Sequence, residues 1–391
     1  MKRFLKIAAI GLAAILIAGL LFFFFVLSGI VEDALNRTIN PPPYEASAEA
    51  RNLHRTLTIA DLHADSLLFG RDLLKRATRG HVDLPRLIDG NVALQVFSAV
   101  TKSPRGLNIE QNDDDTDDII LIALGNRWPV KTWFSLKERA IYQADRLIDA
   151  TLRSDGRLVL VRTKGDLARF LERRKSEPTI VATLLAIEGA HALDGDVSNV
   201  AVLFASGYRM MSGAHFFDNE MAGSAHGMDK GGLTELGRDM IRRMEETKMI
   251  VDLSHASPAQ IDDVLSVATR PVVVSHTGVR GTCDNRRNLT DDQIKAIAAN
   301  GGLIGIGFWD TAVCGTDAAA IASAQRHVAD LVGIDHVALG SDYDGTVAVP
   351  FDASGMVVLT EALMKEGFSA EDIGKIMGGN QIRFMLENLP D

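Results

Sequence analysis

The residues with the clearest chemical potential end an apolar segment, Ile59-Ala60-Asp61-Leu62-His63-Ala64-Asp65. The segment is apolar and partly β-branched, which predicts a β-strand. Residues two positions apart in an extended chain point to the same side, so the side chains of His63 and Asp65 are directed at one point. An imidazole and a carboxylate are suitable ligands for a divalent metal ion. The pair gains weight only if other strands supply ligands to the same place.

Other apolar segments are also followed by histidines and carboxylates. These residues are, in chain order, Glu188, His215, His255, His276 and Asp342. With His63, four of the 10 histidines therefore lie at predicted strand ends. Several imidazoles and carboxylates gathered at one place are difficult to satisfy without a metal ion. Nitrogen and oxygen ligands without a cysteine thiolate fit Zn²⁺, Mn²⁺ or Fe²⁺.

The number of candidate ligands suggests two metal ions, and one carboxylate must then bridge them. Glu188 is the candidate, because it stands between the two histidine-bearing groups in chain order. Two neighbouring ions lower the pKa of a shared water molecule and polarise a substrate carbonyl. The constellation therefore predicts a hydrolase.

The elements that must position these residues alternate between apolar strands and helices. We predict strands at 57–62, 92–100, 180–187, 203–211, 249–254, 271–275, 303–308 and 336–340, with helices between most of them. Continuous apolar strands are typical of a buried parallel sheet. About eight such units predict a (β/α)₈ barrel with an insertion after the second strand, and the strand ends of a barrel converge on one face. A doubly wound open sheet is the alternative, but no Gly-x-Gly-x-x-Gly motif supports a dinucleotide site.

The N-terminus is predicted to lie outside the barrel, as a membrane anchor. A basic segment, Met1–Lys6, precedes 25 uncharged residues, Ile7–Val31, and two acidic residues follow. As a helix this run reaches about 37 Å, more than the roughly 30 Å hydrocarbon core of a bilayer. The charge order favours a cytoplasmic N-terminus and a periplasmic or extracellular body. A cleaved signal peptide is the alternative, although the nearest small-x-small site, Ala46-Ser47-Ala48, lies well past the apolar run.

These observations divide the chain into an anchor at 1–31, a linker at 32–56 and a catalytic barrel at 57–391. The net charge of −10, without a basic run, argues against nucleic acid as a partner. The two cysteines, Cys283 and Cys314, do not make a disulfide framework. An oxidising compartment would permit a bridge, and the sequence leaves bridged and free thiols both open.

Together the motifs resemble the membrane (renal-type) dipeptidases, the M19 metallopeptidases of the amidohydrolase superfamily. The resemblance runs from about residue 55 to residue 386 and is carried by Leu-His63-Ala-Asp65, Ile-Glu188-Gly-Ala-His, Asp-Leu-Ser-His255, Val-Ser-His276 and Gly-Ser-Asp342-Tyr-Asp-Gly. It implies a (β/α)₈ barrel that hydrolyses dipeptides with a hydroxide bridging two zinc ions. Residues 213–227 are similar to the bacterial branch, and the resemblance also allows a homodimer.

The same resemblance implies the zinc ligands. One ion would be bound by His63, Asp65 and Glu188. The other would be bound by Glu188, His255 and His276.

It also implies three residues that act on the substrate. His215 matches the residue that binds the substrate carbonyl and its developing oxyanion, and Arg287 matches the arginine that binds the substrate carboxylate. Asp342 matches the aspartate that handles the proton of the attacking water. The planar guanidinium of an arginine makes a two-pronged contact with a carboxylate. A requirement for a free C-terminal carboxylate at this contact would limit the enzyme to dipeptides.

Other histidines receive lesser predicted roles. We predict that His226 lies in a surface loop, with a place in the pocket as the alternative. His191 is predicted to have a supporting role and His336 a stabilising role. The long acidic loop after the second strand leaves the substrate preference open. Dipeptides with a C-terminal D-residue are among the candidate substrates. An N-acyl-amino-acid deacylase or lactonase on the same binuclear site is the alternative. An intact Glu188 argues against a mononuclear deaminase, and the complete ligand set argues against a non-catalytic protein.

Overall fold

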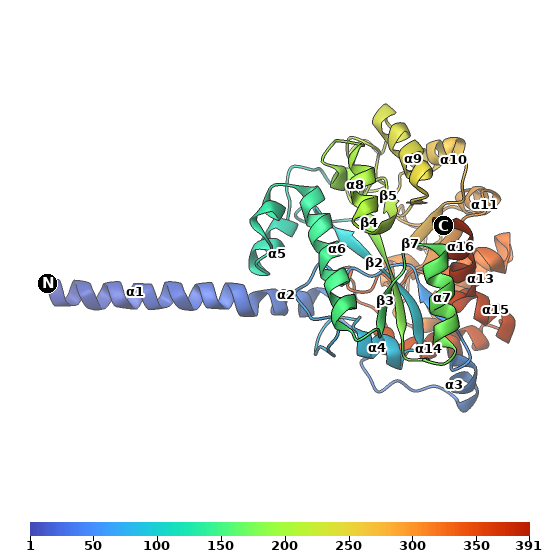
Figure 1. Cartoon of the computed structure of the whole chain (residues 1–391), viewed down its shortest axis with the longest axis horizontal. Helices are drawn as coiled ribbons and strands as arrows, with labels where there is room; N and C mark the ends of the chain where they lie inside the picture. The colour runs from blue at the N-terminus through green and yellow to red at the C-terminus, as the bar shows by residue number, and fades with distance from the viewer.

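Eight apolar segments form parallel strands that close into a barrel in the computed structural model, which describes residues 1–391 (Figure 1). The barrel strands are β1 (Ile59–Asp61), β2 (Val92–Val100), β4 (Val181–Glu188), β5 (Tyr208–Ser212), β6 (Ile250–Asp252), β7 (Val273–Thr277), β8 (Leu303–Ile306) and β9 (Val337–Leu339). The pairings β2–β4 and β1–β9 close the ring. Every residue of these strands is buried, because one side faces the barrel interior and the other faces helices. The predicted (β/α)₈ barrel is confirmed.

Two features near the middle of the chain differ from the sequence prediction. An additional short strand, β3 (Leu158–Leu160), pairs only with β4 and lies outside the ring. Three residues are too few to show a periodic pattern. The strand predicted at 203–211 was wrong at its start, because Asn199–Ala205 form helix α8 and β5 begins at Tyr208. A short apolar run such as this one fits a helix or a strand equally well.

Helices cover the outside of the barrel, and side-chain caps determine where several of them begin. Thr163 and Thr290 each form a capping box at the start of a helix, which satisfies backbone donors there. Helices of the body include α3 (Ala48–His54), α4 (Leu84–Asp89), α6 (Leu136–Arg153), α7 (Lys164–Arg174), α9 (Glu235–Thr247), α10 (Pro258–Val267), α11 (Asp291–Ala299), α13 (Ala318–Val332), α14 (Met356–Lys365) and α16 (Asn380–Asn388).

The predicted insertion after the second strand is present between β2 and α6. It contains helix α5 (Ile119–Gly125) and the 3₁₀ helix η2 (Val130–Trp133). A small hydrophobic cluster, which includes Phe69, Ile119 and Trp128, packs the insertion onto the barrel. The insertion therefore has a core of its own beside the carboxyl ends of the strands.

The N-terminal segment is one helix that leads away from the barrel (Figure 1). It consists of α1 (Lys2–Phe22), the π-helical turn η1 (Phe23–Leu27) and α2 (Ser28–Leu35). Its most apolar 18-residue window has a mean hydropathy of 2.9 and no buried residue. By length and composition, this helix is able to cross a membrane.

Residues 32–56, predicted as a linker, lie against the barrel. Glu32 is fully buried and forms ion pairs with Arg71 and Arg79. Thr38 forms a parallel bridge with Val349, and α3 packs against α14. The end of the N-terminal helix is therefore attached to the body by specific contacts.

Candidate metal centre

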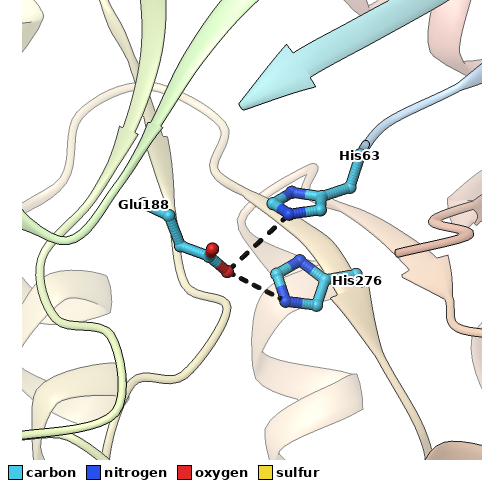
Figure 2. Close-up of side chains that lie close together, drawn as sticks. All are labelled: His63, Glu188 and His276. Atoms are coloured by element: carbon cyan, nitrogen blue, oxygen red, sulfur yellow. Dashed lines mark ion pairs between the residues drawn. The ribbon is translucent and has the colours of Figure 1, made fainter. Parts of the chain in front are cut away.

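The carboxyl ends of β1, β4, β6 and β7 bring three histidines to one oxygen of Glu188. Its Oε1 lies 2.9 Å from Nε2 of His255, 3.2 Å from Nε2 of His276 and 3.7 Å from Nε2 of His63. Figure 2 shows the rings of His63 and His276 both directed at the same oxygen of this carboxylate. Because these residues are far apart in the chain, only the closed barrel brings their ligand atoms together.

Three further predicted residues complete the cluster. The other oxygen of Glu188, Oε2, lies 3.3 Å from Nε2 of His215. Nε2 of His63 lies 3.4 Å from Oδ1 of Asp65 and 3.9 Å from Oδ1 of Asp342. All of these side chains are at least nine-tenths buried, except for Asp342, whose side chain is 11% exposed.

Most of the cluster lines a cavity of about 350 Å³. The predicted residues that line this cavity are Asp65, Glu188, His215, His255, His276, Arg287 and Asp342. The cavity is also lined by apolar residues of the insertion, Leu107, Ile109, Ile119 and Ile122, and by Leu35 of the N-terminal helix.

Unusual backbone conformations direct several of these side chains. Gly189 follows Glu188 with φ +92°, and a Cβ there would lie 2.3 Å from the ring of His191, so only glycine fits. His255 and Asp342 have φ of +63° and +58°, which is uncommon for residues other than glycine. Such conformations persist where the surrounding structure holds them, and they cluster at functional sites.

A buried network of hydroxyl groups holds His276, near the end of β7. Ser275 Oγ lies 2.9 Å from Nδ1 of His276 and 2.9 Å from Ser254 Oγ. Asp252 Oδ1 accepts hydrogen bonds from the backbone N–H groups of Ser254 and Ser275. Contacts of this kind at one ring nitrogen orient the other nitrogen toward a metal. These residues were not predicted from the sequence, although a Ser-His pair at the end of two neighbouring strands was an available signal.

The electrostatics of the cluster favour a bound cation. Burial, reinforced by the neighbouring Asp65, raises the pKa of Glu188 well above its ordinary value. Burial also raises the pKa of Asp342, to about 8. The pKa values of His255 and His276 are lowered well below the ordinary value, mainly by burial. Neutral imidazoles beside buried carboxylates that form no ion pair with an arginine or lysine are a ligand set suited to a divalent ion.

Unsatisfied ligand atoms lead to the same conclusion. Nε2 of His63 and Oδ1 of Asp65 are buried without a hydrogen-bond partner. Ligand atoms within 4.8 Å of one another occur in three groups: His63, Glu188 and His276; Glu188, His215 and His255; and His63, Asp65 and Asp342. The donor set therefore fits divalent metal ions, with Glu188 and His63 shared between groups.

Arg287 lies in the cavity wall and is held in place by β7. Its Nη2 donates a hydrogen bond to the carbonyl oxygen of His276 at 2.8 Å, and its guanidinium lies 5.6 Å from the ring of Trp309. A disulfide between Cys283 and Cys314 ties the loop that carries Arg287 to the loop after β8. The sequence left this bridge open, because the two residues are separated by 31 positions.

The surface-loop prediction for His226 was wrong. His226 is fully buried, and its ring stacks on Phe216 at 4.7 Å and lies 5.3 Å from the ring of His255. Its Nδ1 lies 2.9 Å from the carbonyl oxygen of Ile109, in the insertion. The loop is buried because the insertion folds over it, a contact between segments more than 100 residues apart.

The other two histidines lie on different sides of the barrel. His191 is buried behind His215, with ring centroids 6.5 Å apart, and packs against Phe217. His336 immediately precedes β9, at the amino end of the barrel, and its Nδ1 lies 2.8 Å from the carbonyl oxygen of Gly302. His336 is therefore remote from the metal cluster.

Comparison with known proteins decides the family. The family model of the membrane dipeptidases, peptidase family M19, matches residues 47–388. The chain belongs to this family. A curated relative, dipeptidase tcpJ of Claviceps purpurea, is 31% identical over 317 residues, which are 79% of this chain and 69% of that protein.

Solved structures show the same fold. A metallopeptidase of Rhodobacter sphaeroides, liganded with a phosphinate mimic of the dipeptide L-Ala-D-Ala, has a TM-score of 0.70 at 24% identity over 85% of this chain and 99% of its own. The probable dipeptidase PvdM of Pseudomonas aeruginosa has a TM-score of 0.72 at 20% identity over 87% of this chain and 98% of its own. The resemblance to the M19 family is thus confirmed, and the protein is a metallo-dipeptidase.

Proposed function

We propose that this M19 dipeptidase hydrolyses dipeptides at a site of two zinc ions. His63, Asp65 and Glu188 hold one ion, and Glu188, His255 and His276 hold the other. The observation that carries this proposal is the position of Glu188, whose two oxygens face histidines from different strands. No arginine or lysine forms an ion pair with its buried carboxylate, and two cations would supply the missing positive charge.

The residues of the chain have distinct roles in the proposed reaction. When bound, the two ions polarise the scissile carbonyl and acidify the attacking water. Arg287 binds the C-terminal carboxylate of the dipeptide with its planar guanidinium, and Asp342 takes the proton of the water and passes it to the leaving amine. His215 donates a hydrogen bond to the developing oxyanion, which stabilises the transition state more than the bound substrate.

We extend the substrate class to dipeptides with a C-terminal D-residue. The support comes from the Rhodobacter sphaeroides metallopeptidase, which was solved with a mimic of L-Ala-D-Ala. That protein shares the fold of this chain, with a TM-score of 0.70.

We also propose that the N-terminal helix is a retained anchor, with a cytoplasmic N-terminus and the barrel in the periplasm or outside the cell. The bond between Cys283 and Cys314 suits an oxidising compartment. Cleavage after Ala48 would remove Glu32 and leave Arg71 without one of its two buried carboxylate partners. A retained anchor divides the chain into an anchor at 1–31, a linker at 32–56 and a barrel at 57–391.

Metal content and hydrolysis of the full-length protein in detergent test the proposal together. The substrates are an L,L dipeptide, an L,D dipeptide and an N-acyl amino acid. We expect close to two zinc ions per chain with dipeptide turnover, and in His255→Ala a fall to about one ion with loss of turnover. His336→Ala is the matched control, because His336 is a histidine remote from the cluster.

Other results would change the assignment. Two metal ions with turnover of only the N-acyl amino acid would replace the dipeptide proposal with a deacylase. One metal ion, with full activity, would contradict the binuclear site.

A further inference from the structure

The residues that follow helix α5 contact the N-terminal helix at a particular height along its axis. Oγ of Ser28 donates a hydrogen bond to Oδ1 of Asn126 at 2.7 Å, and the guanidinium of Arg127 lies 4.4 Å from the ring of Phe25. In Figure 1, α5 forms the edge of the body beside the place where this helix leaves it. The insertion therefore meets the helix at residues 25–28.

This level coincides with the expected boundary of the bilayer. About 20 helical residues cross a hydrocarbon core of roughly 30 Å, so a span that starts at Ile7 ends near residue 26. Glu32, less than two turns further on, is already buried in the body. The end of α5 thus lies where lipid tails give way to headgroups.

The insertion presents apolar side chains to its surroundings at this edge. Outside the N-terminal helix, three of the eight exposed large apolar residues fall within residues 119–134: Leu121 at 50%, Val130 at 60% and Phe134 at 85%. All seven residues of α5 are uncharged, and η2 packs against α5. Arg127 and Lys131 lie between the apolar residues in the sequence, and Lys131 also pairs with Glu138 at 2.7 Å. Interfacial segments commonly combine lysine or arginine with apolar residues in this way.

We propose that residues 119–134 form a second contact with the lipid bilayer, beside the spanning helix. Leu121, Val130 and Phe134 enter the interface, and Arg127 and Lys131 lie at the level of the lipid phosphates. The inference rests on the retained anchor proposed above, and it is independent of the reaction. Exposed apolar groups of this size are costly in water and favourable in the interface.

The contact determines where the substrate cavity opens. Ile119 and Ile122 of α5 line the cavity, and so does Leu35 of the N-terminal helix. Leu35 stands nine residues beyond residue 26, which is about 14 Å at 1.5 Å per residue. The cavity therefore takes its peptides close to the membrane surface.

Fluorescence quenching in vesicles tests the contact on the full-length protein. Both native cysteines are in the disulfide, so Leu121→Cys, Val130→Cys and Phe134→Cys each provide one free thiol for a fluorescent label. Leu152→Cys is the matched control, because Leu152 is 79% exposed at the far end of α6. The vesicles contain phosphatidylcholine and phosphatidylglycerol, with nitroxide groups on lipid chains as quenchers, and iodide serves as the aqueous quencher.

We expect labels at 121, 130 and 134 to lose fluorescence with nitroxide lipid and to resist iodide, with the reverse at 152. If the protein floats with the vesicles and all four labels respond only to iodide, the second contact is refuted and the anchor stands. If the protein does not float with the vesicles, the second bilayer contact and the membrane anchor are both refuted. Dipeptide turnover in the same samples reports separately on the proposed reaction.

Discussion

Replacing Glu32 with alanine should destabilise the barrel, although Glu32 belongs to the N-terminal helix. The Glu32 carboxylate is fully buried between Arg71 and Arg79. Arg71, whose side chain is 2% exposed, also pairs with Asp344, two residues beyond Asp342. Glu32→Ala would leave Arg71 with one carboxylate partner for its buried charge.

The size of the effect follows from the burial of the two arginines. Removing one partner of a buried ion pair typically costs about 3–5 kcal/mol. Arg71 keeps Asp344, and Arg79 is 33% exposed and can be hydrated, which places the cost at the lower end. At about 2.1 cal/mol/K per residue, a barrel of this size has an unfolding entropy near 0.7 kcal/mol/K, so a loss of about 3 kcal/mol lowers Tm by about 4 °C.

Thermal unfolding of the full-length protein in detergent, followed by circular dichroism, measures this shift. Asp33→Ala is the matched control, because Asp33 is the next residue on the same helix, is exposed and forms no ion pair. A chain that lacks residues 1–45 should lose at least as much stability as Glu32→Ala. Equal Tm values for Glu32→Ala and Asp33→Ala would refute the reasoning, because Arg71 would then be satisfied without Glu32.

Three further predictions concern the cavity. Glu188→Gln should reduce the metal content to one ion per chain or less and abolish hydrolysis; an active variant with two ions would exclude a bridging role. Arg287→Ala should mainly raise KM for dipeptides, since it removes a contact made in both ground and transition states, and an unchanged KM would remove Arg287 from the substrate site. In metal-free protein, burial raises the pKa of Asp342 to about 8, far above the ordinary value of about 3.9, so the folded chain binds this proton more tightly than the unfolded chain. The urea concentration at the midpoint of unfolding should therefore decrease as the pH rises from about 7 to about 8.5, a range above the ordinary pKa of histidine. Asp342→Asn should make this decrease smaller. A midpoint that rises over this range would contradict the raised pKa.

The membership of the cluster was largely predictable, because its chemistry follows local patterns. His63, His255 and His276 each end an apolar run, and a buried parallel strand delivers its last residue to the same face as its neighbours. The supporting residues were less visible. Ser275 and Asp252 lie on the strands themselves, where a polar residue is recognised as functional only when its partner is known.

The order of apolar runs along the chain by itself determined the barrel, the N-terminal helix and the face on which the histidines meet, since these depend on period, length and strand direction. Only the tertiary structure decided that Glu188 stands between four histidines, that His226 is buried, that Cys283 reaches Cys314 and that Glu32 pairs with Arg71. Each of these is a contact between distant segments. Each forms only when the closed fold brings its two segments together, and no local pattern of residues records which segments meet.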